Sequence, residues 1–259
     1  MPFSFTVLAS GSRGNATLIR AGNTHVLVDC GLGIRQLSAR LGERGVEPES
    51  LDAVIVTHEH ADHLAGVAAL ARRHHVPVWL TAGTRAAWRH APQPQDGAEV
   101  HSLSPHQPLA IGDLQIEPYP VPHDAREPCQ YVFSDGAKRL GMLSDAGCVT
   151  PHMRSCLNAC DALLLEFNHD TQMLQDGPYP DALKRRVLGR YGHLSNTQAA
   201  TLLGEMDCSR LQHLVAIHLS EKNNRPDLAL AAAAGALGCT PDWLSCATQD
   251  TGLDWRAVH

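Results

Sequence analysis

One stretch decides how this chain folds: Thr57-His58-Glu59-His60-Ala61-Asp62-His63. Residues 53–56 form an apolar run just before it, and such a run is typical of a buried β-strand. In residues 64–71, just after it, apolar side chains fall at helical spacing. The sequence therefore predicts that four metal-competent side chains sit on the turn between a strand and a helix.

The spacing inside this turn suits two ions. In an extended backbone His58 and His60 project from the same side, whereas Asp62 and His63 are adjacent and must point in different directions. The turn can thus offer two imidazoles to one ion, and a carboxylate plus an imidazole to a second. The alternative is a polar strand-end loop in a chain that holds 16 histidines, but clustered His and carboxylate side chains favour a metal site.

The composition is that of an ordinary globular protein. The chain has 259 residues, of which 44% are hydrophobic and 19% charged, so one domain over residues 1–259 is the simplest expectation. No apolar run approaches the length needed to cross a bilayer, and residues 1–5 lack the basic and apolar regions of a signal peptide. Eight cysteines without such a signal predict reduced thiols and a cytoplasmic location. The net charge of −6 argues against coating nucleic acid through overall charge, but it allows a local basic groove.

Apolar runs and turn signals predict the other elements. Strands are expected over residues 3–8, 16–20, 24–29, 77–80, 114–121, 131–133, 139–143, 162–165 and 214–217. Helices are expected over residues 35–41, 84–90 (with an exposed polar loop after it), 181–190 and 195–206, and from 226 to Gly235 or Gly238. The helix over 181–190 is basic, which suits either a nucleic-acid backbone or an ordinary solvated face.

Three more ligand-type residues each follow a predicted strand: His123, Asp145 and His218. A single strand-end His or Asp is more often a satisfied polar residue than a ligand. Together with the four side chains of the turn, however, they make a set of nitrogen and oxygen ligands large enough for two ions. Such a set needs no thiolate and suits zinc or manganese without choosing between them.

The loops near these positions hold candidate substrate contacts. One Ser/Gly loop, residues 9–15, can offer N–H groups and hydroxyls to an anion or simply form a turn. A polar segment after His218 can contact phosphates or cap the helix that begins at Pro226. The candidates are Ser10, Ser12, Asn15, Ser220, Asn223 and Asn224.

Candidate catalytic groups are Asp62 and His193. Asp62 can act as a ligand alone, or it can also orient the nucleophile as a general base. His193 follows a glycine and precedes a helix N-terminus, so it can protonate a leaving oxygen, grip a phosphate, or have no catalytic task. His169 and Asp170 are expected to orient a ligand imidazole. His152, Cys156 and Cys160, spaced four apart, allow a third metal site, but buried core cysteines are expected there.

The turn matches the His-x-His-x-Asp-His signature of the metallo-β-lactamase superfamily, which the whole chain resembles. It is most similar to the YycJ/WalJ-type DNA exonuclease branch. The segments that carry this second resemblance are Ala9-Ser10-Gly11-Ser12-Arg13-Gly14-Asn15, His123-Asp124-Ala125-Arg126-Glu127-Pro128, Glu166-Phe167-Asn168-His169-Asp170, Gly192-His193-Leu194-Ser195-Asn196 and His218-Leu219-Ser220-Glu221-Lys222-Asn223-Asn224. The resemblance implies an α/β fold, a four-layer αββα sandwich with a dinuclear site at one edge of its sheets.

The resemblance also implies three ligands for each ion and one shared carboxylate. These are His58, His60 and His123 for the first ion, Asp62, His63 and His218 for the second, and Asp145 between them. Two divalent ions about 3.5–4 Å apart can share a bridging hydroxide and stabilise an in-line displacement at phosphorus. The implied protein is a hydrolase that degrades DNA from an end, 5′ to 3′, with this hydroxide as nucleophile and with no membrane or obligate protein partner.

Other functions remain open on the sequence. The same scaffold carries β-lactamases, thioester hydrolases of the glyoxalase II type and small cyclic-phosphate diesterases; Asp145 argues only against those lactamases that place Cys there. The interval from Asp145 to His218 leaves no room for the large inserted domain of RNA-cutting β-CASP enzymes. Diiron oxygen-reducing relatives carry Glu at the position of His60. A non-enzymatic DNA-binding protein would need a closed, four-coordinate structural metal, whereas this ligand set leaves positions open for water.

Overall fold

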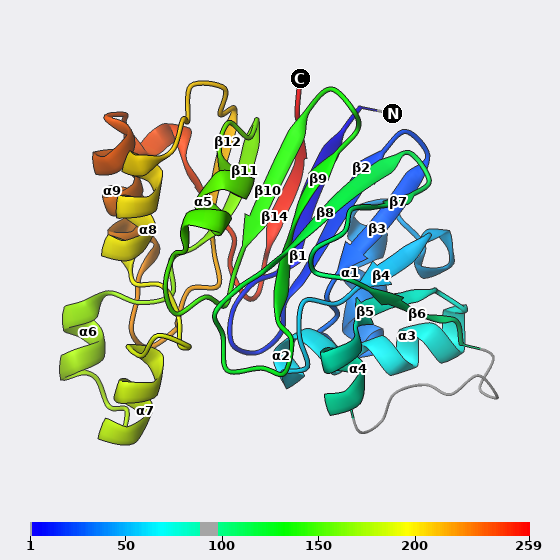
Figure 1. Ribbon diagram of the computed structural model, residues 1–259, viewed down its shortest axis with the longest axis horizontal. Coiled ribbons are helices and arrows are strands. Elements are labelled where there is room, and N and C mark those ends of the chain that lie inside the picture. Colours follow the sequence, from blue (N-terminus) through cyan, green and yellow to red (C-terminus); the bar gives the residue numbers. More distant parts are fainter. Residues whose placement is uncertain (1, 89–97) are drawn as a thin grey trace.

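The computed structural model describes residues 2–88 and 98–259, whose strands form two seven-stranded sheets (Figure 1). The first sheet contains β1 (Ser4–Ala9), β2 (Ala16–Ala21), β3 (Thr24–Val28), β4 (Ala53–Ile55), β5 (Val78–Thr81), β6 (Val100–Leu103) and β14 (Leu253–Ala257), in the order β14-β1-β2-β3-β4-β5-β6. The second contains β7 (Leu109–Ile111), β8 (Leu114–Pro120), β9 (Cys129–Ser134), β10 (Arg139–Leu143), β11 (Ala162–Glu166), β12 (His213–Ile217) and β13 (Ser245–Cys246), in the order β13-β12-β11-β10-β9-β8-β7.

Helices cover the outer faces of both sheets (Figure 1). On the first sheet these are α1 (Ile34–Glu43), α2 (Ala61–Leu64), α3 (Val67–His74) and α4 (Ala82–Ala87), with the short 3-10 helix η1 (Pro48–Ser50). On the second they are α5 (Pro151–Leu157), α8 (Asn196–Glu205) and α9 (Pro226–Leu237), with η3 (Pro241–Trp243) after them. Two short helices, α6 (Thr171–Asp176) and α7 (Asp181–Val187), project below α8 in the view of Figure 1.

Three apolar cores hold the layers together. The core between the sheets contains Phe5, Ile19 and Phe133. A second core packs the first sheet against its helices through residues such as Leu37, and a third packs the second sheet against its helices through residues such as Leu202. The predicted four-layer αββα fold class is therefore confirmed.

Both sheets are mixed, and this brings strand ends to one edge. In the first sheet β3, β4, β5 and β6 run parallel. In the second, β10, β11, β12 and β13 run parallel, and β8 shares their direction because it and β10 are both antiparallel to β9. Carboxyl ends of parallel strands meet at the same edge of a sheet, so residues that follow β4, β8, β10 and β12 can gather there although they are far apart in the sequence.

Most expected elements are present, with a few differences. The helix expected over residues 64–71 is split into α2 and α3 at Gly66, whose N–H donates to the carbonyl of Cys30 and whose Cα leaves no room for a side chain beside the Leu32 carbonyl. The basic helix α7 ends at Val187, before Arg190. The four edge strands β6, β7, β13 and β14 and the helices α5 and α6 are not among the expected elements. The expected helix over 84–90 is present as α4, whereas its last residues and the polar loop after it lie outside the described residues.

The helix expected from residue 195 is α8, which Ser195 and Gln198 begin with a capping box, and α9 ends at Gly238 in a left-handed conformation. All eight cysteines are free thiols. Within the described part of the chain, no helix has the length and apolar character to cross a membrane.

Candidate metal centre

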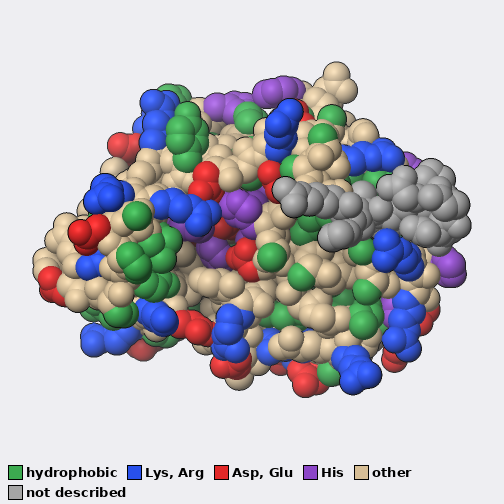
Figure 2. All heavy atoms as spheres, turned by 90° about the horizontal axis from the view of Figure 1, so that it is seen from below, with side chains coloured by type: hydrophobic (Ala, Val, Ile, Leu, Met, Phe, Trp, Pro, Cys, Tyr) green, Lys and Arg blue, Asp and Glu red, His purple; other side chains and the backbone are tan. Residues whose placement is uncertain are grey.

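Ligand-type side chains from both sheets meet at the edge where the parallel strands end. The turn after β4, the loop after β8, and the ends of β10 and β12 bring together the seven predicted positions, which are His58, His60, Asp62, His63, His123, Asp145 and His218. From below, His and acidic side chains gather in a hollow of the surface, with Lys or Arg side chains near its rim (Figure 2).

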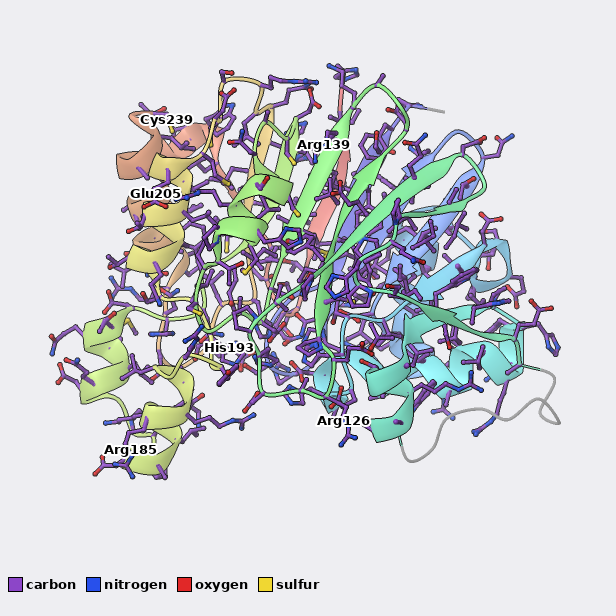
Figure 3. All side chains as sticks on the ribbon, in the orientation of Figure 1. Arg126, Arg139, Arg185, His193, Glu205 and Cys239 are labelled. Atoms are coloured by element: carbon purple, nitrogen blue, oxygen red, sulfur yellow. The ribbon has the colours of Figure 1, made fainter. Side chains whose placement is uncertain are left out.

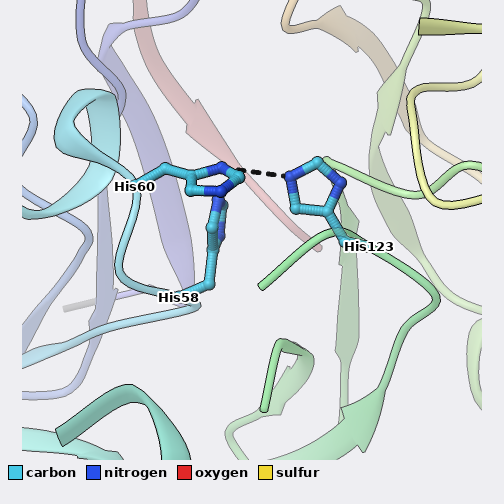
Figure 4. Close-up of side chains that lie close together, drawn as sticks. All are labelled: His58, His60 and His123. Atoms are coloured by element: carbon cyan, nitrogen blue, oxygen red, sulfur yellow. Dashed lines mark hydrogen bonds between the residues drawn. The ribbon is translucent and has the colours of Figure 1, made fainter. Parts of the chain in front are cut away.

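Three of the histidines form one group. His58, His60 and His123 offer ligand atoms that all lie within 4.8 Å of one another (Figure 4). Each ring has one nitrogen anchored: His58 Nδ1 to the Thr57 hydroxyl (3.0 Å), His60 Nε2 to the Asp124 carbonyl (3.2 Å) and His123 Nδ1 to the Gly192 carbonyl (3.0 Å). These anchors leave the other nitrogen of each ring for the centre, the pattern of metal-bound imidazoles.

The distance between the nitrogens that face each other in this group shows whether a cation fits between them. Because Nε2 of His60 and Nδ1 of His123 both donate to carbonyl oxygens, neutral rings turn lone pairs toward each other at His60 Nδ1 and His123 Nε2, which are 3.2 Å apart. Two imidazole nitrogens bound to one tetrahedral ion at about 2.0–2.1 Å stand about 3.3 Å apart. His58 Nε2 is buried without a hydrogen-bond partner among the described residues. A divalent cation satisfies all three nitrogens.

A second group combines Asp62, His63 and His218. His63 is fully buried, and its Nδ1 lies 2.7 Å from Asp29 Oδ2, so its Nε2 faces inward, 3.3 Å from Asp62 Oδ2. Nε2 of His218 lies 3.5 Å from the same Asp62 oxygen. Asp62 and His63 therefore point to one place despite being adjacent, because α2 begins between His60 and Asp62.

Asp145 lies between the two groups. Its Oδ2 is 3.2 Å from His63 Nε2, and its Oδ1 is 3.3 Å from His218 Nδ1 and 3.9 Å from His123 Nε2. The side chain is 3% exposed, compared with 24% for Asp62. Asp145 is thus the carboxylate placed to contact ions in both groups, and Asp62 is the one that faces solvent.

Two buried carboxylates that are not among the predicted site residues, Asp29 and Glu166, orient the histidines. Asp29 accepts hydrogen bonds from Thr57 N (2.8 Å) and the Thr57 hydroxyl (2.9 Å) besides contacting His63. Glu166 Oε1 lies 2.9 Å from His193 Nδ1 and 3.1 Å from His218 Nδ1. Its Oε2 accepts from the backbone N–H groups of Ala146 and Leu194, both at 3.1 Å. The signal that found His123 was available for both, because each stands at the end of a predicted strand.

The electrostatics of the centre favour bound cations. Burial opposes ionisation of Asp145, but the neighbouring His218 and His63 outweigh it and hold the pKa of Asp145 well below its usual range. Burial also disfavours the charged form of His218, yet Asp145, Asp62 and Glu166 raise its pKa to about 10. In His58, by contrast, burial lowers the pKa and keeps the imidazole neutral, as ligation requires. The carboxylates thus attract positive charge, which divalent ions can supply in place of protons.

A cavity of about 240 Å³ opens beside the centre. It is lined by Asp62, Asp145, His193 and His218, together with Ser12 and Ser220 from the predicted substrate contacts. His193, 20% exposed, presents its ring to this cavity while Nδ1 is held by Glu166. Ser12 and His193 are therefore placed to meet a substrate, whereas Ser220 lines the cavity but is itself buried.

The other predicted substrate contacts have structural partners. Ser10 accepts a hydrogen bond from the backbone N–H of His218 (2.7 Å), and Asn15 Nδ2 lies 3.2 Å from Asp62 Oδ2. Asn223 donates to the Ser220 hydroxyl (3.1 Å), and Asn224 donates to the Phe167 carbonyl (2.7 Å). These four side chains are buried, so they support the loops around the centre.

The orienting role expected of His169 and Asp170 belongs to other residues. His169 is fully buried, and neither of its ring nitrogens has a hydrogen-bond partner in the described ranges. Asp170 caps α6 by accepting from Met173 N. Asp29 and Glu166 orient the histidines instead. Cys156 and Cys160 are buried core residues, as expected, although His152 Nε2 approaches the Cys156 sulfur to 3.7 Å.

An open cavity beside buried, pre-oriented nitrogen and carboxylate ligands distinguishes a catalytic metal site from a closed structural one. Fold and site together are those of a metal-dependent enzyme.

Comparison with known proteins specifies the class further. Residues 24–219 match the model of a beta-lactamase superfamily domain. Exodeoxyribonuclease YycJ of Bacillus anthracis is 33% identical to this chain over 239 residues, which cover 92% of this chain and 90% of that protein. Exodeoxyribonuclease WalJ of Streptococcus pneumoniae is 34% identical over 229 residues, covering 88% and 85%. Among solved structures, the metallo-beta-lactamase fold protein YhfI from Bacillus subtilis superposes with a TM-score of 0.76 at 20% identity, covering 99% of this chain and 100% of that one. The chain belongs to the metallo-β-lactamase-fold superfamily and, within it, to the YycJ/WalJ-type branch.

Proposed function

We propose that this protein is a two-metal phosphodiesterase that degrades DNA from an end, in the 5′ to 3′ direction. The observation that carries the proposal is the convergence of two ligand groups on one shared carboxylate, Asp145, beside an open cavity. The names of the two relatives, both exodeoxyribonucleases, support DNA as the substrate. The direction rests on the resemblance to their branch.

The ligand sets follow the two groups described above. We assign His58, His60 and His123 to the first ion, Asp62, His63 and His218 to the second, and Asp145 to both. Nitrogen and oxygen donors alone suit Zn²⁺ or Mn²⁺. Divalent ions held there supply Lewis acidity at the phosphoryl oxygens and lower the pKa of bound water toward neutrality.

Asp62 has the position of a ligand that also orients water. Burial disfavours its charged form, but His63 and His218 outweigh that effect and hold its pKa well below the usual range. Asp62 therefore stays ionised and accepts hydrogen bonds. Its partial exposure on the cavity wall lets it align a water molecule with the phosphorus atom of a substrate.

His193 has the position of the general acid. Glu166 holds its Nδ1 at 2.9 Å, so Nε2 is the nitrogen left for a substrate in the cavity that His193 lines. Glu166 is buried, which opposes ionisation, yet His193 and His218 lower its pKa to about 2. An ionised Glu166 accepts from Nδ1–H and orients the ring, so that a proton on Nε2 can be given to the leaving oxygen.

The test is an end-labelled nuclease assay. The metal-loaded protein is incubated with single- and double-stranded DNA labelled at the 5′ or the 3′ end, with Zn²⁺ and Mn²⁺ compared. We expect the 5′ label to be released first as a mononucleotide and Asp62→Ala to lose the activity. If the sample leaves the DNA intact but hydrolyses nitrocefin or S-lactoylglutathione, the proposal is refuted and the protein is another hydrolase of this fold.

A further inference from the structure

Helix α7 and the loop that joins it to α6 form one wall of the cavity beside the metal centre. Residues Tyr179, Leu183, Arg186 and Val187 line that wall. The two helices project from the body of the molecule (Figure 1), and the carbonyl of Val187 accepts a hydrogen bond from the N–H of His193. The wall is therefore tied to a candidate catalytic residue, while its outer parts face solvent.

Arg186 is the only Lys or Arg among the described residues that line the cavity. Three aspartates line the same cavity, which are Asp62, Asp124 and Asp145. An anionic substrate entering this space meets a single guanidinium, apart from any bound ions. The Arg186 side chain is 56% exposed, so its guanidinium is accessible from the cavity mouth.

Asp124 holds Arg186 next to the first ligand group. Arg186 Nε lies 2.5 Å from Asp124 Oδ2, while the other oxygen, Oδ1, is 3.4 Å from His123 Nε2 and 3.8 Å from His60 Nε2. One carboxylate thus connects the arginine to the inward-facing nitrogen of His123 and to the anchored nitrogen of His60. An ion pair as exposed as this one is weakly held, so an incoming phosphate can replace the carboxylate.

We propose that Arg186 binds a backbone phosphate of the substrate in the cavity, exchanging its bond to Asp124 for one to the phosphate. This inference rests on the proposed phosphodiesterase function and names the group that selects for phosphate. A guanidinium presents parallel N–H donors that match two phosphate oxygens, which lysine cannot do. Asp124 serves as a placeholder that keeps the arginine extended toward the centre until substrate arrives.

The neighbouring arginine provides a matched control. Arg185 is on the same helix and carries the same charge, but it is exposed and does not line the cavity. In Figure 3 it lies at the outer end of α7, away from His193. Arg185→Gln therefore removes one positive charge from α7 without touching the cavity.

The experiment compares the parent enzyme with Arg186→Gln, Arg186→Lys and Arg185→Gln. Steady-state kinetics are measured on a 5′-phosphorylated oligonucleotide and on bis(4-nitrophenyl) phosphate, and bound metal is measured by mass spectrometry. A lost charge-assisted hydrogen bond predicts that Arg186→Gln raises KM about 10- to 100-fold on both substrates, with a much smaller change in kcat. Arg186→Lys should fall between parent and Gln, and Arg185→Gln should match the parent. Metal content and melting temperature should be the same in all four proteins.

Two results would overturn the inference alone. The first is that Arg186→Gln has the same KM as the parent. The second is that kcat and the amount of bound metal both fall while KM stays constant, which would mean that Arg186 only holds Asp124 in position. If the parent hydrolyses neither substrate, both the proposed function and this inference are wrong.

Discussion

The variant Glu166→Gln tests whether Glu166 orients the histidine rings of the metal centre or only stabilises the folded protein. Glu166 accepts four N–H groups: the rings of His193 and His218 at one oxygen, and the backbone of Ala146 and Leu194 at the other. A glutamine can satisfy the two backbone donors with its carbonyl oxygen only by turning its amide N–H groups toward the rings. Each ring must then accept at Nδ1 and carry its proton on Nε2, the nitrogen that faces the centre.

The wrong tautomer damages function more than stability. His218 can no longer give Nε2 to an ion, and loss of such an outer partner typically lowers metal affinity about 10- to 100-fold. His193 loses the carboxylate that accepts from Nδ1 and orients its ring, so we expect kcat to fall about 10²- to 10⁴-fold. Because the hydrogen bonds are re-formed, the free energy of unfolding should fall by no more than about 1.5–3 kcal/mol, the typical worth of one charge-assisted bond.

Asp161→Asn is the matched control. Asp161 is also a buried carboxylate, and it stands immediately before β11, the strand that Glu166 ends. It accepts from Arg139 N (2.9 Å) and pairs with Arg210 (3.1 Å), far along the strand from the centre. Its replacement should lower stability in urea unfolding while metal affinity, measured by chelator competition, stays parental. A Glu166→Gln protein with parental metal affinity and parental kcat would refute the tautomer argument.

Three further predictions follow from the same geometry. His193→Gln should lower kcat about 10²- to 10⁴-fold with metal content unchanged; metal lost together with activity would make His193 a ligand instead of an acid. Chelator treatment should lower the melting temperature by about 5–10 °C, which is the effect of removing ions present at a hundredfold excess over Kd. Adding Zn²⁺ or Mn²⁺ should restore it, and a melting temperature that does not change with chelator would contradict a metal centre. Gly66→Ala should cost about 1–3 kcal/mol in urea unfolding, because its side chain would meet the Leu32 carbonyl. Gly204→Ala, in open space on α8, should instead be neutral or slightly stabilising, and equal effects at both positions would argue against crowding at Gly66.

Much of the fold was predictable because its central strands are buried on both faces. Segments such as β4, β11 and β12 give short continuous apolar runs, and those runs are what the sequence displays. The strand β14 escaped prediction because it lies at a sheet edge, where half-buried and exposed residues give no clear alternation. The helix break at Gly66 also escaped, because it depends on the loop around Cys30, which is distant in sequence.

The candidate metal ligands were predictable from the sequence, whereas the carboxylates that orient them were not. Clustered histidines stand out in any sequence, and strand-end positions led from them to His123, Asp145 and His218. Asp29 and Glu166 also stand at the ends of predicted strands, but position alone does not distinguish a carboxylate that orients a histidine from any other polar residue at a strand end. Only the pairing of β3 with β4 shows that Asp29 lies beside the histidine turn.

The backbone at the sheet edge links these two kinds of residue. Asp29, Asp145 and His218 all have left-handed backbone conformations, with φ of 60°, 53° and 55°, within two residues of the ends of β3, β10 and β12. Such a conformation costs a non-glycine residue about 1–3 kcal/mol, less for Asp and His than for bulkier types. Glycine would remove that cost, but it would also remove the contact to His63 or the candidate ligand. The strain is therefore retained at positions where the alternation of side chains along a strand ends and the next side chain turns along the edge of the sheet. In this protein a non-glycine residue with a left-handed conformation just after a buried strand marks the candidate site, independently of the histidine motif.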